Sequence, residues 1–446
     1  MSTMTRWVLV APVLFSVIPM NPQFVVADDV IPRNPPLRWW KGNIHTHSLW
    51  SDGSDFPEMI CEWYRTRGYN FLALSDHNTL SEGERWMPHS TIKERSGSQA
   101  LKKYLDRFGP HWVETQGDPG TPGYAVRLKP LNEFRALVEQ RGKFIMIQGE
   151  EITDQAAGKP VHLNATNIKS LIQPLGGQTV REAINNNLRA VEEQAQRAGR
   201  PILLHINHPN FGFAITAEDL AAVVKERFFE VYNGHPSVEH LGNATRPGVE
   251  LLWDIANTLR ISEFKAAPLY GVGTDDSHEY HGRPGSRPGR GWIMVRSRYL
   301  SPEHLIRAVN AGDFYASSGV TLAEVKFDSE SQTLTIGIQG DPGVKYRTDF
   351  IGTRVDYDKA SQPRRGEDGK VLASTRQYST DVGKVLHTVE GKLARYQLTG
   401  RELYVRALIT ADRPVDDPAF AGQLQQAWTQ PVGWQKHLVD DASPEN

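Results

Sequence analysis

Short apolar runs alternate with stretches of helical periodicity over residues 39–318. The runs have the length of buried strands, and they occupy residues 42–45, 71–74, 143–148, 161–165, 202–205, 228–232, 269–273 and 292–295. Between them, the pattern predicts amphipathic helices at 56–67, 179–198, 216–228 and from Ser301 onward. Strand–helix alternation of this kind predicts a parallel α/β fold, and a span of about 280 residues fits a barrel.

Two segments depart from this alternation. Residues 81–142 include a long polar stretch that carries Gly and Pro, and its scattered aromatic residues predict an ordered lid inserted into the barrel. From residue 319 onward, short segments alternate apolar and polar positions at 322–327, 333–338, 345–351, 396–398 and 403–409. We therefore predict an α/β barrel over residues 41–318, followed by an antiparallel β-sandwich-like domain over 319–446.

The N-terminus has the features of a secretory signal. Arg6 precedes an apolar stretch at 7–20, and the compact residues Val25 and Ala27 suit cleavage after Ala27. We predict a signal peptide over 1–27, a Pro-bearing linker over 28–40, and a periplasmic or secreted protein without stable membrane insertion after cleavage. The alternative is an uncleaved anchor or a disordered leader.

Charge and cysteine content narrow the possible functions. The chain has 50 Lys and Arg against 52 Asp and Glu, a formal charge of −2, which argues against a broad nucleic-acid footprint or a polybasic membrane patch. Its single cysteine, Cys61, rules out an intramolecular disulfide framework and a Cys-rich zinc site. The expected partner is a small-molecule substrate, and the sequence leaves the oligomeric state open.

Histidines and carboxylates recur where the predicted strands end, which is where an α/β barrel keeps its active site. Six strands supply them: His45, His47 and the nearby Asp52; Asp76 and His77; Glu150 and Glu151; His162; His205 and His208; Asp275, Asp276 and His278. Because residues i and i+2 of a strand face the same side, His45 and His47 point together, as do Asp276 and His278. Nitrogen and oxygen ligands without a thiolate suit zinc, manganese or iron, and their number predicts a cluster of two or three divalent ions.

The order of these residues resembles the PHP superfamily, named for polymerase and histidinol phosphatase. The resemblance covers residues 40–318, and the segments 149–153, 274–278 and 314–320 look most like its exported branch, which includes carbaryl hydrolase. It implies a distorted (β/α)7 barrel of the TIM-like kind that holds three divalent metals. Carried over by position, it implies three ligand sets: His45, His47, Glu151 and Asp276 for the first metal; Glu151, His162 and His208 for the second; Asp52, His77 and His278 for the third. Some family members have His at the position of Asp52.

Three doublets require a choice between neighbouring residues. The resemblance favours Glu151 over Glu150, because an aliphatic residue and a small hydroxyl residue follow it. It favours His208 over His205, because His208 precedes a proline. Asp276 is favoured over Asp275 because only Asp276 shares a strand face with His278.

The candidates for catalysis and substrate binding follow from this cluster. Glu151 is expected to bridge two ions that activate water, and Asp76 is expected to orient a ligating imidazole. Arg283, with Arg287 and Arg290 on the same loop, is expected to hold a phosphate group. Trp50 is expected to pack against an apolar part of the substrate. The catalytic candidates are thus Asp76, Glu151 and Arg283, and the substrate-binding candidates are the three arginines and Trp50.

Two enzymatic functions and one without catalysis are compatible with these residues. The superfamily resemblance implies metal-dependent hydrolysis of a small phosphate ester, which is the main prediction. The branch resemblance points instead to a carbamate or carboxylic ester. The third possibility is a metal-holding protein without turnover, and the complete ligand set argues against it.

Overall fold

The structure is a computed structural model that describes residues 33–438, so the predicted signal peptide lies outside the described residues. The described part of the chain divides into two units, residues 33–36 and residues 37–438. Residues 33–36 of the first unit hold no helix or strand. The first strand of the second unit, β1, begins at Arg38, inside the segment predicted as linker.

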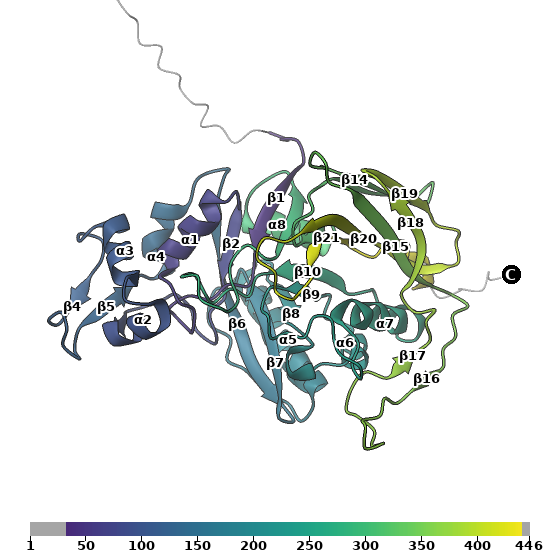
Figure 1. Ribbon diagram of the computed structural model, residues 1–446, viewed down its shortest axis with the longest axis horizontal. Coiled ribbons are helices and arrows are strands. Elements are labelled where there is room, and N and C mark those ends of the chain that lie inside the picture. The colour runs from purple at the N-terminus through teal and green to yellow at the C-terminus, as the bar shows by residue number, and fades with distance from the viewer. Residues whose placement is uncertain (1–32, 439–446) are drawn as a thin grey trace, which may run out of the picture. The chain divides into compact units, whose positions relative to one another are not determined.

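The second unit is built on one mixed sheet of 13 strands (Figure 1). Its first nine strands in chain order are β1 (Arg38–Asn43), β2 (Phe71–Leu74), β6 (Ile145–Ala156), β7 (Lys159–Thr166), β8 (Leu203–Ile206), β9 (Phe228–Asn233), β10 (Tyr270–Thr274), β11 (Trp292–Ser297) and β12 (Phe314–Ser317). Parallel pairing joins β1 to β2, β2 to β6, β8 to β9 and β9 to β10, whereas β7 is antiparallel to both of its neighbours. The α/β class is confirmed, and parallel pairing predominates among the seven strands from β10 to β1 in sheet order, whereas β11 is antiparallel to both β1 and β12.

The two ends of this strand series meet beyond the last residues of β1 and β10. A parallel bridge joins Thr46 to Ser277, and the Asp276 N–H donates to the His45 carbonyl at 3.0 Å. The residues that follow β1 and β10 therefore lie side by side.

Helices begin and end where local chemistry favours it. Helix α5 (Val180–Ala198) begins after Thr179, whose hydroxyl accepts from the Glu182 N–H, and it ends at Gly199 in the left-handed conformation. Helix α6 (Ala217–Ala222) starts with a capping box but is shorter than the predicted 216–228. It stops early because the Arg260 guanidinium donates to the carbonyls that follow, at Val223, Val224 and Glu226. The other helices of this part are α1 (Pro57–Thr66), α7 (Val249–Ser262) and α8 (Pro302–Asn310).

The segment predicted as a lid forms an ordered subdomain. Its elements are β3 (Arg85–Pro88), α2 (His89–Ser96), α3 (Ala100–Phe108), β4 (Thr115–Gln116), β5 (Ala125–Leu128) and α4 (Leu131–Val138), and the three strands pair in the order β3-β5-β4 (Figure 1). Their apolar side chains form a cluster with Leu49, Trp50 and Phe56. The insertion is therefore packed onto the loop that follows β1.

The C-terminal part is antiparallel and continues the main sheet. Its strands are β13 (Leu322–Asp328), β14 (Thr333–Ile338), β15 (Tyr346–Arg354), β16 (Ser361–Gln362), β17 (Gln377–Tyr378), β18 (Lys384–Glu390), β19 (Leu393–Gln397), β20 (Glu402–Pro414) and β21 (Leu424–Thr429). Strand β21 pairs with both β12 and β20, so the sheet is continuous, while β13, β14 and β19 form a separate sheet. Leu334 and Ile336 of the separate sheet share one apolar cluster with Phe350 and Ile409 of the main sheet. Within residues 33–438, no helix has the length and apolar character of a membrane span.

One buried carboxylate makes the stability of this fold depend on pH. Burial raises the pKa of Glu226 to about 8. The hydrogen bonds that its carboxylate accepts from the Phe228 and Arg227 N–H groups, and the charge of Arg260, lower the pKa but do not offset the effect of burial. The unfolded chain loses this proton near pH 4.5, so the Glu226 contribution to stability is complete below that pH and is lost as the pH rises to about 8.

We expect Glu226→Gln to reduce the loss of stability between pH 5 and pH 8 by at least about 1 kcal/mol, because glutamine keeps the acceptor oxygen and has no charge. Urea unfolding at both pH values measures the effect. Exposed Glu330→Gln is the control, and an unchanged pH dependence in Glu226→Gln would contradict the prediction.

Candidate metal centre

The first group of side chains comes from the ends of β1 and β10. His45 Nε2 and His47 Nε2 lie 3.1 and 3.2 Å from Asp276 Oδ1. The same two nitrogens lie 3.5 and 3.4 Å from Glu151 Oε2. Asp276 has a φ of 49°, and its left-handed backbone conformation accompanies the turn out of β10. Two imidazole nitrogens and two carboxylate oxygens thus converge on one point.

Glu151, in the middle of β6, connects this group to a second one. Its Oε1 lies 3.0 Å from His162 Nδ1 and 3.5 Å from His208 Nε2, and it accepts from Asn207 Nδ2 at 2.7 Å. His162 reaches Glu151 because β7 folds back antiparallel on β6, which pairs His162 with Thr153. The two oxygens of Glu151 face different histidines, which is the arrangement of a carboxylate that bridges two ions.

The third group lies at the outer edge of the cluster. Asp52 lies 3.5 Å from His77 Nε2 and 3.4 Å from His278 Nε2, and the His47 ring stacks on that of His278 with 4.0 Å between centroids. The Asp52 side chain is 52% exposed, whereas the other members of this group are buried or half-buried. His77 Nδ1 is 2.8 Å from Glu151 Oε2, which links this group to the first. The structure therefore brings all nine predicted ligands together.

The buried polar atoms of the cluster fit a bound cation. Among the described residues, His45 Nε2, both ring nitrogens of His47 and Glu151 Oε2 are buried without a hydrogen-bond partner. Such atoms are costly to bury, and a metal ion at the meeting point of His45 Nε2, His47 Nε2 and Glu151 Oε2 would give these three atoms a partner. Nitrogen and oxygen ligands in these numbers suit divalent zinc, manganese or iron.

The charges of the cluster favour the same conclusion. Burial lowers the pKa of His47 to about 3, so that its imidazole is neutral, the form that binds metals. Burial opposes ionisation of Glu151, but the neighbouring His77 and His45 hold the pKa of its carboxyl well below the usual value. Burial also opposes a charge on His77, yet Glu151 and Asp52 raise its pKa to about 11. The cluster therefore holds negative charge that either protons or metal cations compensate.

A carboxylate absent from the sequence predictions, Glu230, supports this cluster from within β9. Its Oε1 lies 2.6 Å from His45 Nδ1 and accepts from the Thr274 hydroxyl at 2.7 Å, and its Oε2 accepts from the His208 N–H at 2.7 Å. A carboxylate on one ring nitrogen of His45 leaves the other nitrogen directed at the metal position. The sequence signal was a lone Glu inside the apolar run 228–232.

The structure also places the first member of each doublet. Glu150 is buried and accepts from the Ile172 N–H at 3.1 and 3.2 Å. Asp275 accepts from the Tyr64 hydroxyl at 2.7 Å, and His205 is fully buried on β8. Glu150 and Asp275 direct their carboxylates away from the nine ligands.

Asp76 has contacts that differ from those expected of it. Its carboxylate accepts from the N–H and hydroxyl of both Ser48 and Ser51, at 2.7 to 3.1 Å. All these bonds go to the loop that leads to Asp52, and within residues 33–438 none joins Asp76 to an imidazole. Asp76 therefore orders the loop that leads to Asp52, whereas the sequence led us to expect that it orients a histidine.

The three predicted phosphate-binding arginines are engaged by carboxylates. Arg290 donates from Nε and Nη2 to the two oxygens of Asp417, at 3.1 Å each. Arg287 also pairs with Asp417, at 2.8 Å. Arg283 pairs with Glu279 at 3.1 Å, and its side chain is the most exposed of the three. All three guanidinium groups therefore have protein partners, and Arg283 also donates to the Glu94 carbonyl at 3.0 Å.

The aromatic side chain at the rim differs from the predicted one. Trp50 is only 3% exposed, and it donates to the Lys129 carbonyl at 3.3 Å inside the apolar cluster of the insertion, which makes it a core residue. Phe211, in the short helix η1 (Phe211–Phe213) that follows His208, is half-buried. Its ring centroid lies 5.2 Å from that of His208 and 6.2 Å from that of His162. Phe211 is thus an aromatic residue that contacts two of the predicted ligands.

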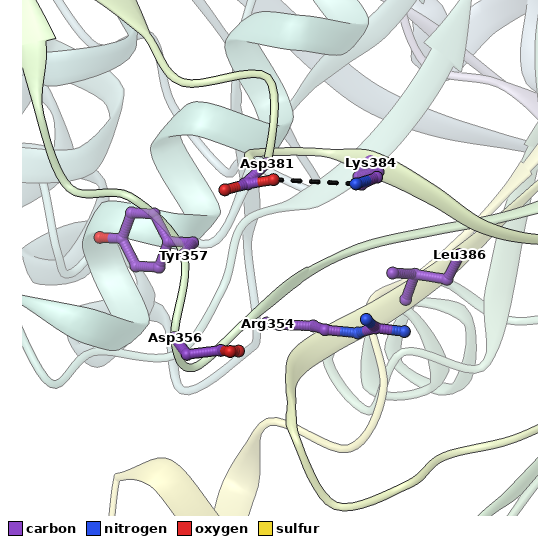
Figure 2. Close-up of a pocket in the computed structure, with 6 residues that line it drawn as sticks. All are labelled: Arg354, Asp356, Tyr357, Asp381, Lys384 and Leu386. Carbon is purple, nitrogen blue, oxygen red and sulfur yellow. Dashed lines mark ion pairs between the residues drawn. The ribbon is translucent and has the colours of Figure 1, made fainter.

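A separate hollow lies among the C-terminal strands. Figure 2 shows its lining, which consists of Arg354, Asp356, Tyr357, Asp381, Lys384 and Leu386. Its volume is about 120 Å³, and Lys384 pairs with Asp381 across 3.8 Å (Figure 2). The hollow shares no residue with the metal-ligating cluster.

Nine chains of solved structures resemble this one, including one from Bacteroides vulgatus and one from Bifidobacterium adolescentis. No family model and no curated protein matches the chain. A two-domain protein of Bacteroides vulgatus that contains a predicted PHP-like metal-dependent phosphoesterase is 15% identical, with a TM-score of 0.37, over 90% of this chain and 100% of that one. A proposed metal-dependent phosphoesterase of Bifidobacterium adolescentis is 16% identical, with a TM-score of 0.28, over 57% of this chain and 92% of that one. The first neighbour bears the PHP name that the order of the motifs suggested, and at these TM-scores neither neighbour says what this chain does.

Proposed function

We propose that this chain is a metal-dependent hydrolase of the PHP type, and that it acts on a small phosphate ester. The observation that carries the proposal is the convergence of nine imidazole and carboxylate side chains, with Glu151 facing two sets of histidines through its two oxygens. The strands support a distorted seven-stranded barrel: β10, β9, β8, β7, β6, β2 and β1 follow one another in the sheet, and Thr46–Ser277 joins the two ends. The proposal includes a sandwich-like C-terminal part and a site of action outside the cytoplasm.

Three sets of side chains would hold the ions. His45, His47, Glu151 and Asp276 form the first set, Glu151, His162 and His208 the second, and Asp52, His77 and His278 the third. Two divalent ions in such a shell would lower the pKa of water, polarise the electrophile and offset the charge of the transition state. The chain fixes the ring of His45 through Glu230 and orders the Asp52 loop through Asp76.

A carbamate or carboxylic ester is the second candidate substrate. Two observations favour it: Asp417 engages Arg287 and Arg290, and the half-buried ring of Phe211 lies against two ligands. An apolar surface beside a metal cluster suits an aryl or alkyl leaving group. The same metal cluster would serve both reactions, because each needs activated water and a polarised electrophile.

A paired assay with metal analysis tests the proposal. Protein loaded with manganese or zinc is expected to hold two to three ions and to release nitrophenol from a nitrophenyl phosphate, while an aryl carbamate and an aryl acetate are turned over more slowly. Turnover of the carbamate and acetate alone would establish the second candidate. Full metal content without turnover of either class would make the chain a metal-binding protein.

The variant Arg283→Gln separates the two enzymatic proposals. Arg283 is the most exposed guanidinium of its loop, so its loss is expected to lower kcat/KM for the phosphate ester about tenfold, through one charge-assisted hydrogen bond. The aryl acetate is expected to react within about twofold of the unchanged protein, because it carries no anionic phosphate. Equal kcat/KM values for the phosphate ester in both proteins would show that Arg283 does not contact the phosphate.

A further inference from the structure

His235 lies beside the metal cluster without belonging to the nine predicted ligands. It follows β9, and its backbone N–H donates to Asn233 Oδ1 at 2.8 Å. The amide nitrogen of Asn233 donates to Glu230 Oε2 at 2.8 Å and to Asp276 Oδ2 at 3.2 Å. One asparagine side chain therefore ties the position of His235 to a ligand and to the carboxylate that supports His45.

The ring of His235 faces the cluster. Its centroid lies 5.7 Å from that of His278, edge to face at 81°. Asp276, His208 and His45 are also close enough to interact electrostatically with it. These four residues come from all three ligand sets, so His235 is adjacent to the cluster as a whole.

A hydrogen bond fixes which nitrogen of His235 carries the proton. The backbone N–H of Ser237 donates to His235 Nδ1 at 3.1 Å. A nitrogen that accepts from a backbone N–H holds a lone pair, so the hydrogen of the imidazole is on Nε2. In the described part of the chain, no protein atom accepts from His235 Nε2. The half-buried side chain thus offers one N–H group to a ligand beside the cluster.

The backbone around His235 is held on both sides. The Gly234 N–H donates to the Thr274 carbonyl at 3.0 Å, and the Gly234 carbonyl accepts from Arg290 Nη1 at 2.8 Å. A Cβ at Gly234 would come within 2.8 Å of the Arg290 Cβ, so the loop and the arginine are in close contact. Because Asp417 holds Arg290 in turn, the C-terminal part helps to fix the loop of His235.

We propose that His235 donates a hydrogen bond from Nε2 to an oxygen of the substrate bound at the metal centre. The inference rests on the proposed function and adds a protein donor to it. A fixed N–H group stabilises charge that develops on a substrate oxygen, because it is already oriented before the reaction. Both candidate reactions develop such charge, so the role of His235 applies to a phosphate ester and to a carbamate or carboxylic ester.

Inorganic phosphate is the probe, because it presents tetrahedral anionic oxygens without needing turnover. Binding to the metal-loaded full chain is measured by calorimetry, together with metal content and kcat/KM for the substrate class found active. The variants are His235→Ala, which removes the ring; His235→Phe, which keeps a ring against His278 but has no N–H; and His235→Gln, which keeps a side-chain donor. His111→Gln changes an exposed histidine and serves as the control.

We expect His235→Ala and His235→Phe to bind phosphate about tenfold more weakly at unchanged metal content, and His235→Gln to recover part of the affinity. The control is expected to match the unchanged protein. Equal phosphate affinity in His235→Phe and the unchanged protein would overturn the inference, as would loss of metal from His235→Phe. An unchanged protein that binds no metal would instead overturn the proposed function.

Discussion

Replacing Glu151 with glutamine should abolish turnover and remove at least one metal ion per chain. Glu151 is buried, and each of its two oxygens faces at least two histidine nitrogens within 3.5 Å. The substitution keeps the shape of the side chain but replaces one anionic oxygen with an NH₂ group, which repels a cation. Since Glu151 is shared by two ligand sets, we expect a loss of at least about 10³-fold in kcat, the scale seen when a main electrostatic contribution to a transition state is lost.

The neighbouring Glu150 provides a matched control. It is the adjacent buried glutamate, its carboxylate accepts from the Ile172 N–H, and burial raises its pKa to about 8. At pH 7 this group is therefore mostly neutral, and Glu150→Gln is expected to leave metal content unchanged and turnover within about twofold. Metal content by elemental analysis and kcat are measured on both variants. Full metal content and more than a tenth of the activity in Glu151→Gln would show that this carboxylate does not bridge the ions.

The contrast between the two glutamates shows how far the sequence determines the site. The convergence of the nine predicted ligands could be anticipated because most of them follow short apolar runs, and strand ends of one sheet edge meet in space. Glu151 and His162 lie within β6 and β7. The choice of Glu151 over Glu150 needed a motif, because both residues lie within one strand. The opposite faces of the strand, set by its pleat, decide which of them meets the histidines.

What the sequence did not predict depends on contacts between distant residues. Helix α7 was missed because eleven of its fourteen residues are buried, so it has no polar face to mark its period. The engagement of Arg287 and Arg290 by Asp417 joins residues more than 120 positions apart, which no local pattern reports. Glu230 lies in an apolar strand, and its neighbours in the sequence give no sign that its carboxylate contacts His45.

Cutting the link between helix α7 and the C-terminal strands should produce the largest loss of stability. Asp254 of α7 and Arg406 of β20 are 3% and 1% exposed. They pair through two bonds, from Nε to Oδ1 at 2.8 Å and from Nη2 to Oδ2 at 2.7 Å, and the Tyr404 hydroxyl donates to the same carboxylate at 2.9 Å. Asp254→Ala removes the carboxylate that pairs twice with the buried guanidinium and leaves it only the ion pair with half-buried Glu250 at 3.3 Å, at an expected cost of about 3–5 kcal/mol. For a chain of this size, that corresponds to a fall in Tm of about 3–6 °C.

Thermal unfolding followed by calorimetry measures this loss of stability. It also shows how far the stability of helix α7 and that of the C-terminal strands depend on each other. Asp356→Ala breaks an exposed pair with Arg401 and should cost at most about 1 kcal/mol, which makes it the control for a lost surface charge. Joint replacement of Asp254 by Leu and Arg406 by Met should restore most of the stability, because no buried charge then remains. Since the pair shares no residue with the metal cluster, metal content at 25 °C should not change. If Asp254→Ala instead shifted Tm no more than the control, the pair would contribute nothing to holding α7 against the sheet.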